Sequence, residues 1–160
     1  MHLITSYQEI WTANQNVRGL WENALRQMNN HHYEVFTTER TNGRGDGLMA
    51  AISADEFEIL ASKDCIFNDC GDRVAQAFWL RKRCPKDHSD LDGIRLEDSK
   101  FGEFVCMNTH LLFPHNANSS LIRLRESFKM LEFLQSWKAE VDFGNIPIII
   151  AGDFNGKICD

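Results

Sequence analysis

The sequence predicts a single α/β domain, because short apolar segments typical of strands occur together with two longer segments that are apolar at helical spacing. The chain has 160 residues, one domain's worth, and 43% of them are hydrophobic, which suffices for one ordinary core. Two of the predicted strands end abruptly in polar residues. Functional groups collect at strand ends in open α/β sheets, so these two ends are the first candidates for a site.

The first half of the chain contains one predicted helix and several strands. A helix is predicted over Asn16–Met28 from an apolar face formed by Val17, Leu20, Ala24 and Met28. Tyr33–Thr38 is typical of a short strand, and Leu48–Ser53 and Phe57–Ala61 are predicted to pair as a hairpin. The three glycines of Asn42–Gly47 indicate a turn, since glycine permits backbone angles that other residues avoid.

The second half contains three more predicted strands and one helix. Arg73–Arg81 is predicted as a strand, followed by a polar loop over 83–100. Phe104–Met107 and Ile146–Ala151 are nearly continuous apolar runs, which predicts strands buried on both faces. A helix is predicted over Leu121–Lys138, with an apolar side formed by Leu121, Leu124, Phe128, Leu131 and Leu134.

Composition limits the classes of function. The formal net charge of −6 argues mildly against coating duplex nucleic acid, because proteins with many phosphate contacts are usually basic. It is compatible with an enzyme that meets a phosphate through bound cations. Five cysteines without a Cys-x-x-Cys pair indicate reduced thiols in an intracellular compartment, with cytoplasm and nucleus both open. No apolar run approaches the length that crosses a bilayer, so no transmembrane segment is expected.

The two polar strand ends carry residues capable of chemistry. His110 ends one buried strand, and Asp153 and Asn155 end the other, so the three are expected to be neighbours. Asp153 and Asn155, two apart, would point into one pocket while Phe154 turns back to the core. The pair could hold water, a hard cation or phosphate oxygen, or could close the strand as an Asx-turn. His110 could be a general acid, a phosphate donor, a metal ligand or a structural residue, and Glu9 alone is an ordinary acidic residue.

Four motifs, in one order along the chain, resemble the endonuclease/exonuclease/phosphatase superfamily. They are Gln8-Glu9, Gly47-Leu48, Asn108-Thr109-His110-Leu111 and Gly152-Asp153-Phe154-Asn155. The segments 44–48, 72–76 and 108–114 resemble more specifically a plant branch of calcium-binding, deadenylase-like members. The resemblance implies an incomplete DNase I-like four-layer fold over residues 1–160, a two-sheet β-sandwich flanked by helices. An acidic turn at His88–Ser99 lacks two charged ligands of a calcium loop, so no intact EF-hand is predicted.

The resemblance also implies a function, that of a metal-dependent phosphoesterase that hydrolyses phosphodiesters in an RNA or DNA single strand or in a nucleotide. Glu9 resembles the glutamate that binds Mg²⁺, with Mn²⁺ as the other candidate ion. His110 resembles the histidine that contacts the scissile phosphate, Asp153 the aspartate that orients or activates the attacking water, and Asn155 the asparagine that holds phosphate oxygen. Inositol phosphates and lipid phosphoesters stay open as substrates.

One departure from the superfamily pattern bears on activity. The superfamily has a catalytic strand before the position of Glu9 and another after the position of Asp153, and neither has a counterpart here. Impaired activity is therefore expected for this chain. The alternative is a catalytically inactive remnant or a protein-interaction module with the same fold.

Overall fold

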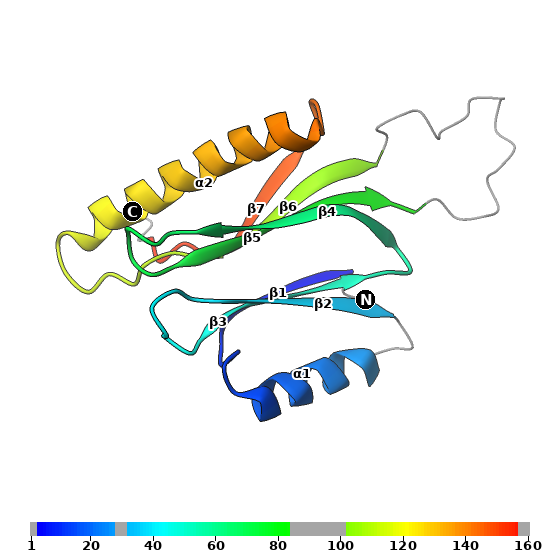
Figure 1. The fold of residues 1–160 in the computed structure, drawn as a ribbon, viewed down its shortest axis with the longest axis horizontal. Coiled ribbons are helices and arrows are strands. Elements are labelled where there is room, and N and C mark those ends of the chain that lie inside the picture. Colours follow the sequence, from blue (N-terminus) through cyan, green and yellow to red (C-terminus); the bar gives the residue numbers. More distant parts are fainter. Residues whose placement is uncertain (1–2, 28–31, 84–101, 157–160) are drawn as a thin grey trace, which may run out of the picture.

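Two β-sheets packed face to face, with one helix on each outer face, form the protein in this computed structural model (Figure 1). The structure describes residues 3–27, 32–83 and 102–156. The first sheet has the order β1 (Ile4–Ile10), β3 (Gly47–Ser53), β2 (Tyr33–Glu39). The second has the order β4 (Phe57–Ile66), β5 (Val74–Lys82), β6 (Glu103–His110), β7 (Ile148–Asp153). Neighbouring strands are antiparallel except β6 and β7, which are parallel.

The two helices complete four layers. α1 (Gln15–Gln27) lies against the first sheet and α2 (Ser119–Val141) crosses the outer face of the second (Figure 1). Apolar side chains fill the space between the sheets, where the rings of Phe36 and Phe78 meet at 5.0 Å. The cluster under α2 includes Met130, Leu134 and Trp137. The predicted two-sheet sandwich flanked by helices is thus confirmed.

The predicted hairpin of residues 48–53 and 57–61 is wrong. β3 is the central strand of the first sheet, whereas β4 is an outer strand of the second and pairs with β5. The short turn at 54–56 carries the chain from one sheet to the other. All seven residues of β3 are buried, because core side chains cover both of its faces. Apolar patterning detects such strands but does not identify their partners.

The predicted apolar side of α2 mostly faces solvent. Its exposed members, each at least 59% exposed, are Leu121, Leu124, Phe128 and Leu131. Leu134 alone of the predicted set is buried, and the helix packs on the sheet through Met130, Leu134 and Trp137. Apolar and polar residues are mixed around the whole helix, so periodicity could not distinguish the side that packs on the sheet.

Two other burial predictions are corrected. In α1, Leu20 is 71% exposed, and the helix instead buries Leu25. The ring centroid of Trp21 lies 5.1 Å from that of Tyr7. β7 was predicted to be buried on both faces, yet Ile148 and Ile149 are 43% and 52% exposed. β7 is the last strand of its sheet, so among the described strands only β6 pairs with it.

Part of the sequence interpretation falls on residues outside the described ones. This holds for the predicted loop beyond Arg83 and for the acidic turn at His88–Ser99. Neither of the two described helices combines the length and the apolar character needed to cross a bilayer.

Candidate functional site

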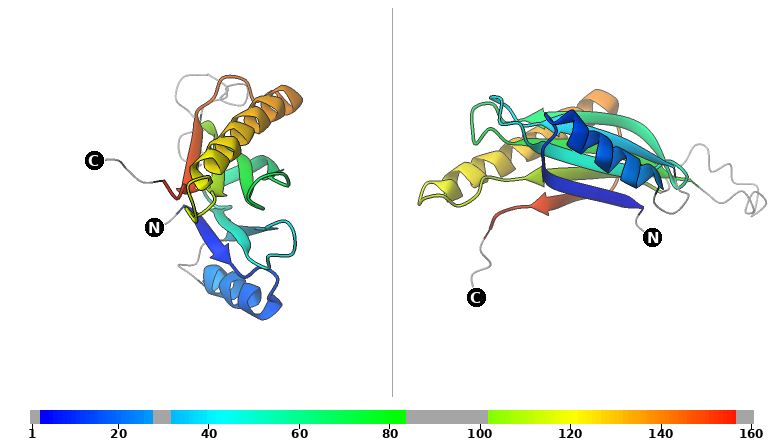
Figure 2. Two further views of the ribbon diagram at one scale, coloured as in Figure 1. Left: turned by 90° about the vertical axis from the view of Figure 1, so that its left-hand side faces the viewer. Right: turned by 90° about the horizontal axis from the view of Figure 1, so that it is seen from below.

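The candidate site lies where β1 and β7 approach each other at one edge of the sandwich (Figure 2). The parallel register of β6 and β7 sets His110 opposite Asp153, and the Leu111 amide donates to the Asp153 carbonyl oxygen at 2.9 Å. The two strands approach very closely just before this point. A Cβ atom at Gly152 would lie 1.9 Å from the carbonyl oxygen of Thr109. The residue before Asp153 must therefore lack a side chain.

Glu9 reaches the same place from the other sheet through a β-bulge. The register between β1 and β3 shifts between Tyr7 and Ile10, and Glu9 adopts a left-handed backbone with φ of 57°. This conformation is uncommon for a residue with a side chain and is typical of strained positions at functional sites. Ile10 is paired with Gly47, where a Cβ atom would lie 2.2 Å from the carbonyl oxygen of Thr38. The second motif glycine is thus also fixed by a close backbone approach.

His110 is the centre of the cluster. Its Nε2 atom lies 3.8 Å from Glu9 Oε1 and 3.8 Å from Asp153 Oδ2, and its side chain is buried. Its Nδ1 atom lies 3.0 Å from Nη1 of Arg73. A guanidinium can only donate, so Nδ1 must accept and the proton of the neutral ring is on Nε2. Burial, and next the positive charge of Arg73, lower the pKa of His110, which favours this neutral tautomer.

Asp153 and Asn155 are held by the turn that ends β7. The Asn155 amide donates to Asp153 Oδ1 at 2.9 Å, and Asn155 Nδ2 donates to the Leu111 carbonyl oxygen at 2.9 Å. The first bond is the Asx-turn that the sequence left open as an alternative. It uses one carboxylate oxygen of Asp153 while the other faces His110. Phe154 is 42% exposed, so the prediction that it turns back to the core is wrong.

A chain of amide side chains supports the site from between the sheets. Gln8 Nε2 donates to Asn108 Oδ1 at 2.9 Å, and Asn108 Nδ2 donates to Gln76 Oε1 at 3.1 Å. Gln76 then donates to the Thr38 hydroxyl at 3.0 Å. Gln8 adjoins Glu9, and Asn108 lies two residues before His110, so this network fixes one sheet against the other beside the site.

Sequence reasoning assigned no role to these supporting residues or to Arg73. Gln8 and Asn108 stand inside the motifs that located Glu9 and His110, and that position was the available signal. Arg73 directly precedes β5 and lies in segment 72–76, one of the segments that resemble the plant branch, and that position was its available signal.

The donor set suits a hard divalent cation. Glu9 and Asp153 present carboxylate oxygens at equal distances from His110 Nε2. Mg²⁺ keeps several water ligands and usually binds only one or two protein carboxylates, so two such groups fit its chemistry. Within the described ranges, no group of three or more His, Cys, Asp or Glu side chains is arranged so that it could hold a metal ion. A cation bound by these carboxylates would therefore keep most of its water ligands.

Known proteins share this fold. No protein-family model matches the chain. It is 35% identical over 150 residues to an uncharacterized calcium-binding protein of Arabidopsis thaliana, a match that covers 94% of this chain and 29% of that protein. The structure of ANGEL2, a 2′,3′-cyclic phosphatase, matches with a TM-score of 0.65 at 20% identity, covering 96% of this chain and 40% of that one.

One of the matching solved structures is a bacterial protein described by its family. The endonuclease/exonuclease/phosphatase family protein from Bacteroides thetaiotaomicron matches with a TM-score of 0.64 at 17% identity, covering 96% of this chain and 48% of that one. The chain therefore shares the fold of this endonuclease/exonuclease/phosphatase family protein, and it spans less than half of that solved chain.

Proposed function

We propose that this chain contributes Glu9, His110, Asp153 and Asn155 to a site that hydrolyses a phosphodiester with the help of a bound divalent cation, Mg²⁺ or Mn²⁺. The observation that supports the proposal is the convergence of Glu9 and Asp153 on His110 Nε2, each at 3.8 Å. These three residues come from β1, β7 and β6, and more than 140 positions of sequence separate the first from the last. The exposed carboxylates at a buried histidine are accessible to substrate.

Each residue has a role that follows from its contacts. His110, fixed by Arg73, directs its Nε2–H toward the carboxylates and would donate to a phosphate oxygen placed between them. Asp153, held by the Asx-turn, would use Oδ2 to orient the attacking water and accept its proton. Asn155 uses one of its two amide hydrogens on Leu111, and the other can donate to phosphate oxygen.

Glu9 would hold the cation, beside the carboxylate of Asp153. Bound Mg²⁺ supplies Lewis-acid chemistry, because it draws negative charge from phosphoryl oxygens. A single-stranded nucleic acid or a nucleotide is the proposed substrate class. ANGEL2, similar in fold, is a cyclic phosphatase solved with adenosine-2′,3′-vanadate, which supports a nucleotide over a lipid.

The test is hydrolysis of oligoadenylate and of bis(p-nitrophenyl) phosphate by the purified chain, with Mg²⁺ and with EDTA. Asp153→Asn keeps the oxygen that closes the Asx-turn and removes the charge. It should lower metal-dependent turnover by about a hundredfold or more. Asp69→Asn, a surface carboxylate paired with Lys129, is the matched control and should retain the rate of the unaltered chain. Turnover that is equal in EDTA, or equal in Asp153→Asn, would refute the proposal. No turnover at all would favour the non-catalytic alternative.

A further inference from the structure

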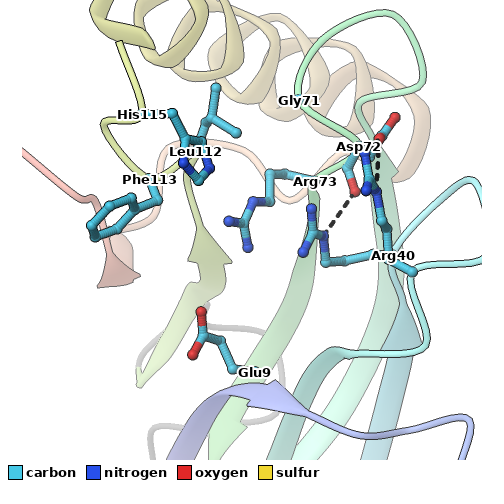
Figure 3. A pocket seen from close by; sticks show the side chains of 9 residues that line it. Glu9, Arg40, Gly71, Asp72, Arg73, Leu112, Phe113 and His115 are labelled. Atoms are coloured by element: carbon cyan, nitrogen blue, oxygen red, sulfur yellow. Dashed lines mark hydrogen bonds and ion pairs between the residues drawn. The ribbon is translucent and has the colours of Figure 1, made fainter.

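A second cavity adjoins the candidate site. It has a volume of about 570 Å³ and shares Glu9 with the catalytic cluster (Figure 3). Its other walls come from the loop after β2, the turn before β5 and the segment after β6. The side chains that line it include three arginines, Arg40, Arg44 and Arg73, together with Phe113 and His115. Its size is that of a small-molecule site, large enough for one nucleotide.

Arg73 is the unusual member of this lining. It is only 4% exposed, and its Nε atom is buried without a hydrogen-bond partner. Among the described residues no carboxylate lies within ion-pair distance of its guanidinium, whose recorded contact is with His110 Nδ1. A buried charge is costly unless it is paired. The cavity therefore presents a fixed positive charge that lacks a negative partner.

The other two arginines are held in place by ion pairs. Arg40 Nη1 contacts both carboxylate oxygens of Asp46 at 3.1–3.2 Å, and its Nε donates to the Asp72 carbonyl oxygen at 3.2 Å. Arg44 contacts Asp72 Oδ2 through Nη2 at 2.7 Å. Figure 3 shows the side chains of Arg40 and Arg73 next to each other at the cavity, with Asp72 above Arg40 in this view. Their like charges and the burial of Arg73 both favour an anion between them; burial and then Arg40 lower the pKa of Arg73.

The opposite wall is aromatic. Phe113 is 53% exposed, and its ring centroid lies 5.3 Å from that of His115 at a tilt of 60°. In Figure 3 the Phe113 ring lies across the cavity from the arginines. An exposed ring of this kind is a surface on which a base can stack, and it is separated from the cations by the width of the cavity.

We propose that this cavity binds the nucleotide next to the scissile phosphate, with Arg40 and Arg73 on its phosphate and Phe113 against its base. The inference rests on the proposed function, because it takes the cluster at His110 as the place of cleavage. It adds that the substrate must extend by one more nucleotide toward the turn at Asp72. Phosphate positions the substrate through charge, and stacking holds the base without selecting its identity.

The test is calorimetric binding of adenosine 5′-monophosphate to the chain in EDTA, where neither the cation nor turnover contributes. Adenosine and inorganic phosphate, each matching half of the site, should bind at least about tenfold more weakly than the nucleotide. Arg40→Gln and Phe113→Ala should each weaken nucleotide binding by about tenfold. Phe113 is exposed, so its truncation leaves the fold intact even if Arg40→Gln lowers stability. Arg18→Gln on α1 is the matched charge control and should bind as the unaltered chain does.

Two outcomes would overturn the inference. One is an unchanged affinity for the nucleotide in both Arg40→Gln and Phe113→Ala. The other is an affinity for inorganic phosphate equal to that for the nucleotide. Asp153→Asn separates this result from the proposed function, because it should lower turnover while Asp153 does not line the cavity. Loss of binding in the cavity variants without any metal-dependent turnover would support the subsite and refute the catalytic proposal.

Discussion

Gly152 gives the sharpest test of how the site is built. Replacing it with alanine would place a Cβ atom 1.9 Å from the Thr109 carbonyl oxygen, at a backbone φ of 144°. Contacts below 3.0 Å are essentially never seen, so β6 and β7 would have to separate by roughly 1 Å. A sparsely populated φ costs about 1–3 kcal/mol and overpacking costs a similar amount. Gly152→Ala should therefore lower the free energy of unfolding by about 2–5 kcal/mol.

The functional loss should exceed what instability explains, because the same shift moves Asp153 away from His110. A displacement of about 1 Å can cost about a hundredfold in rate. Urea unfolding followed by circular dichroism measures the first effect, and phosphodiester hydrolysis under fully folded conditions measures the second. Gly156→Ala is the matched control, since a Cβ atom there meets nothing within 4 Å. If the two variants unfold at the same urea concentration, the close approach of β6 and β7 is not real.

Three further changes test packing and charge. Leu134→Ala should lower the free energy of unfolding by about 2–5 kcal/mol and Leu131→Ala by less than about 0.5 kcal/mol. If urea unfolding shows Leu131→Ala to be the more destabilising change, α2 packs through the side predicted from sequence. Glu126 is buried, and burial raises the pKa of its carboxyl group, so the unaltered chain should lose stability as the pH rises above 4.5 and through the pKa of the folded state. Glu126→Gln should show no such loss. Parallel pH profiles of the free energy of unfolding for the two proteins would refute this. Arg81→Gln leaves the buried carboxylate of Glu103 with the Trp79 indole as its one side-chain donor among the described residues. It should cost about 1.5–3 kcal/mol, a loss that Arg18→Gln should not show.

The sequence predicted element types well and their partners poorly. Eight of the nine described elements overlap a predicted helix or strand, because strongly periodic or continuously apolar segments carry their own signal. β1 was not predicted, since Ile4–Ile10 alternates weakly and contains the bulge at Glu9. β3 and β4 were paired in error because adjacency along the chain favours a hairpin. Only the packing of two sheets, which sequence periodicity does not encode, places them on opposite layers.

The site divides in a different way. Motif order selected Glu9, His110, Asp153 and Asn155, and in the structure the carboxylates of Glu9 and Asp153 both approach the imidazole of His110. Their chemical roles stay predictions. Arg73 lies in segment 72–76, one of the segments that resemble the plant branch, but its burial could not be predicted, since an arginine at the start of a strand is usually solvated and here it is 4% exposed. Burial of a charge is a tertiary property, and no local pattern announces it.

The motif glycines explain how residues far apart in the sequence come together at one site. Gly47 and Gly152 each stand where a Cβ atom would lie within 2.2 Å of a carbonyl oxygen on the neighbouring strand. Each glycine thus admits a closer approach of two strands than any other residue allows. Each also lies beside a strand end that presents a carboxylate: Gly47 pairs with Ile10, the neighbour of Glu9, and Gly152 directly precedes Asp153. The distance between the strands depends on the glycine, and this distance in turn positions the neighbouring carboxylate. A substitution at either glycine should therefore mimic loss of the carboxylate that the glycine positions.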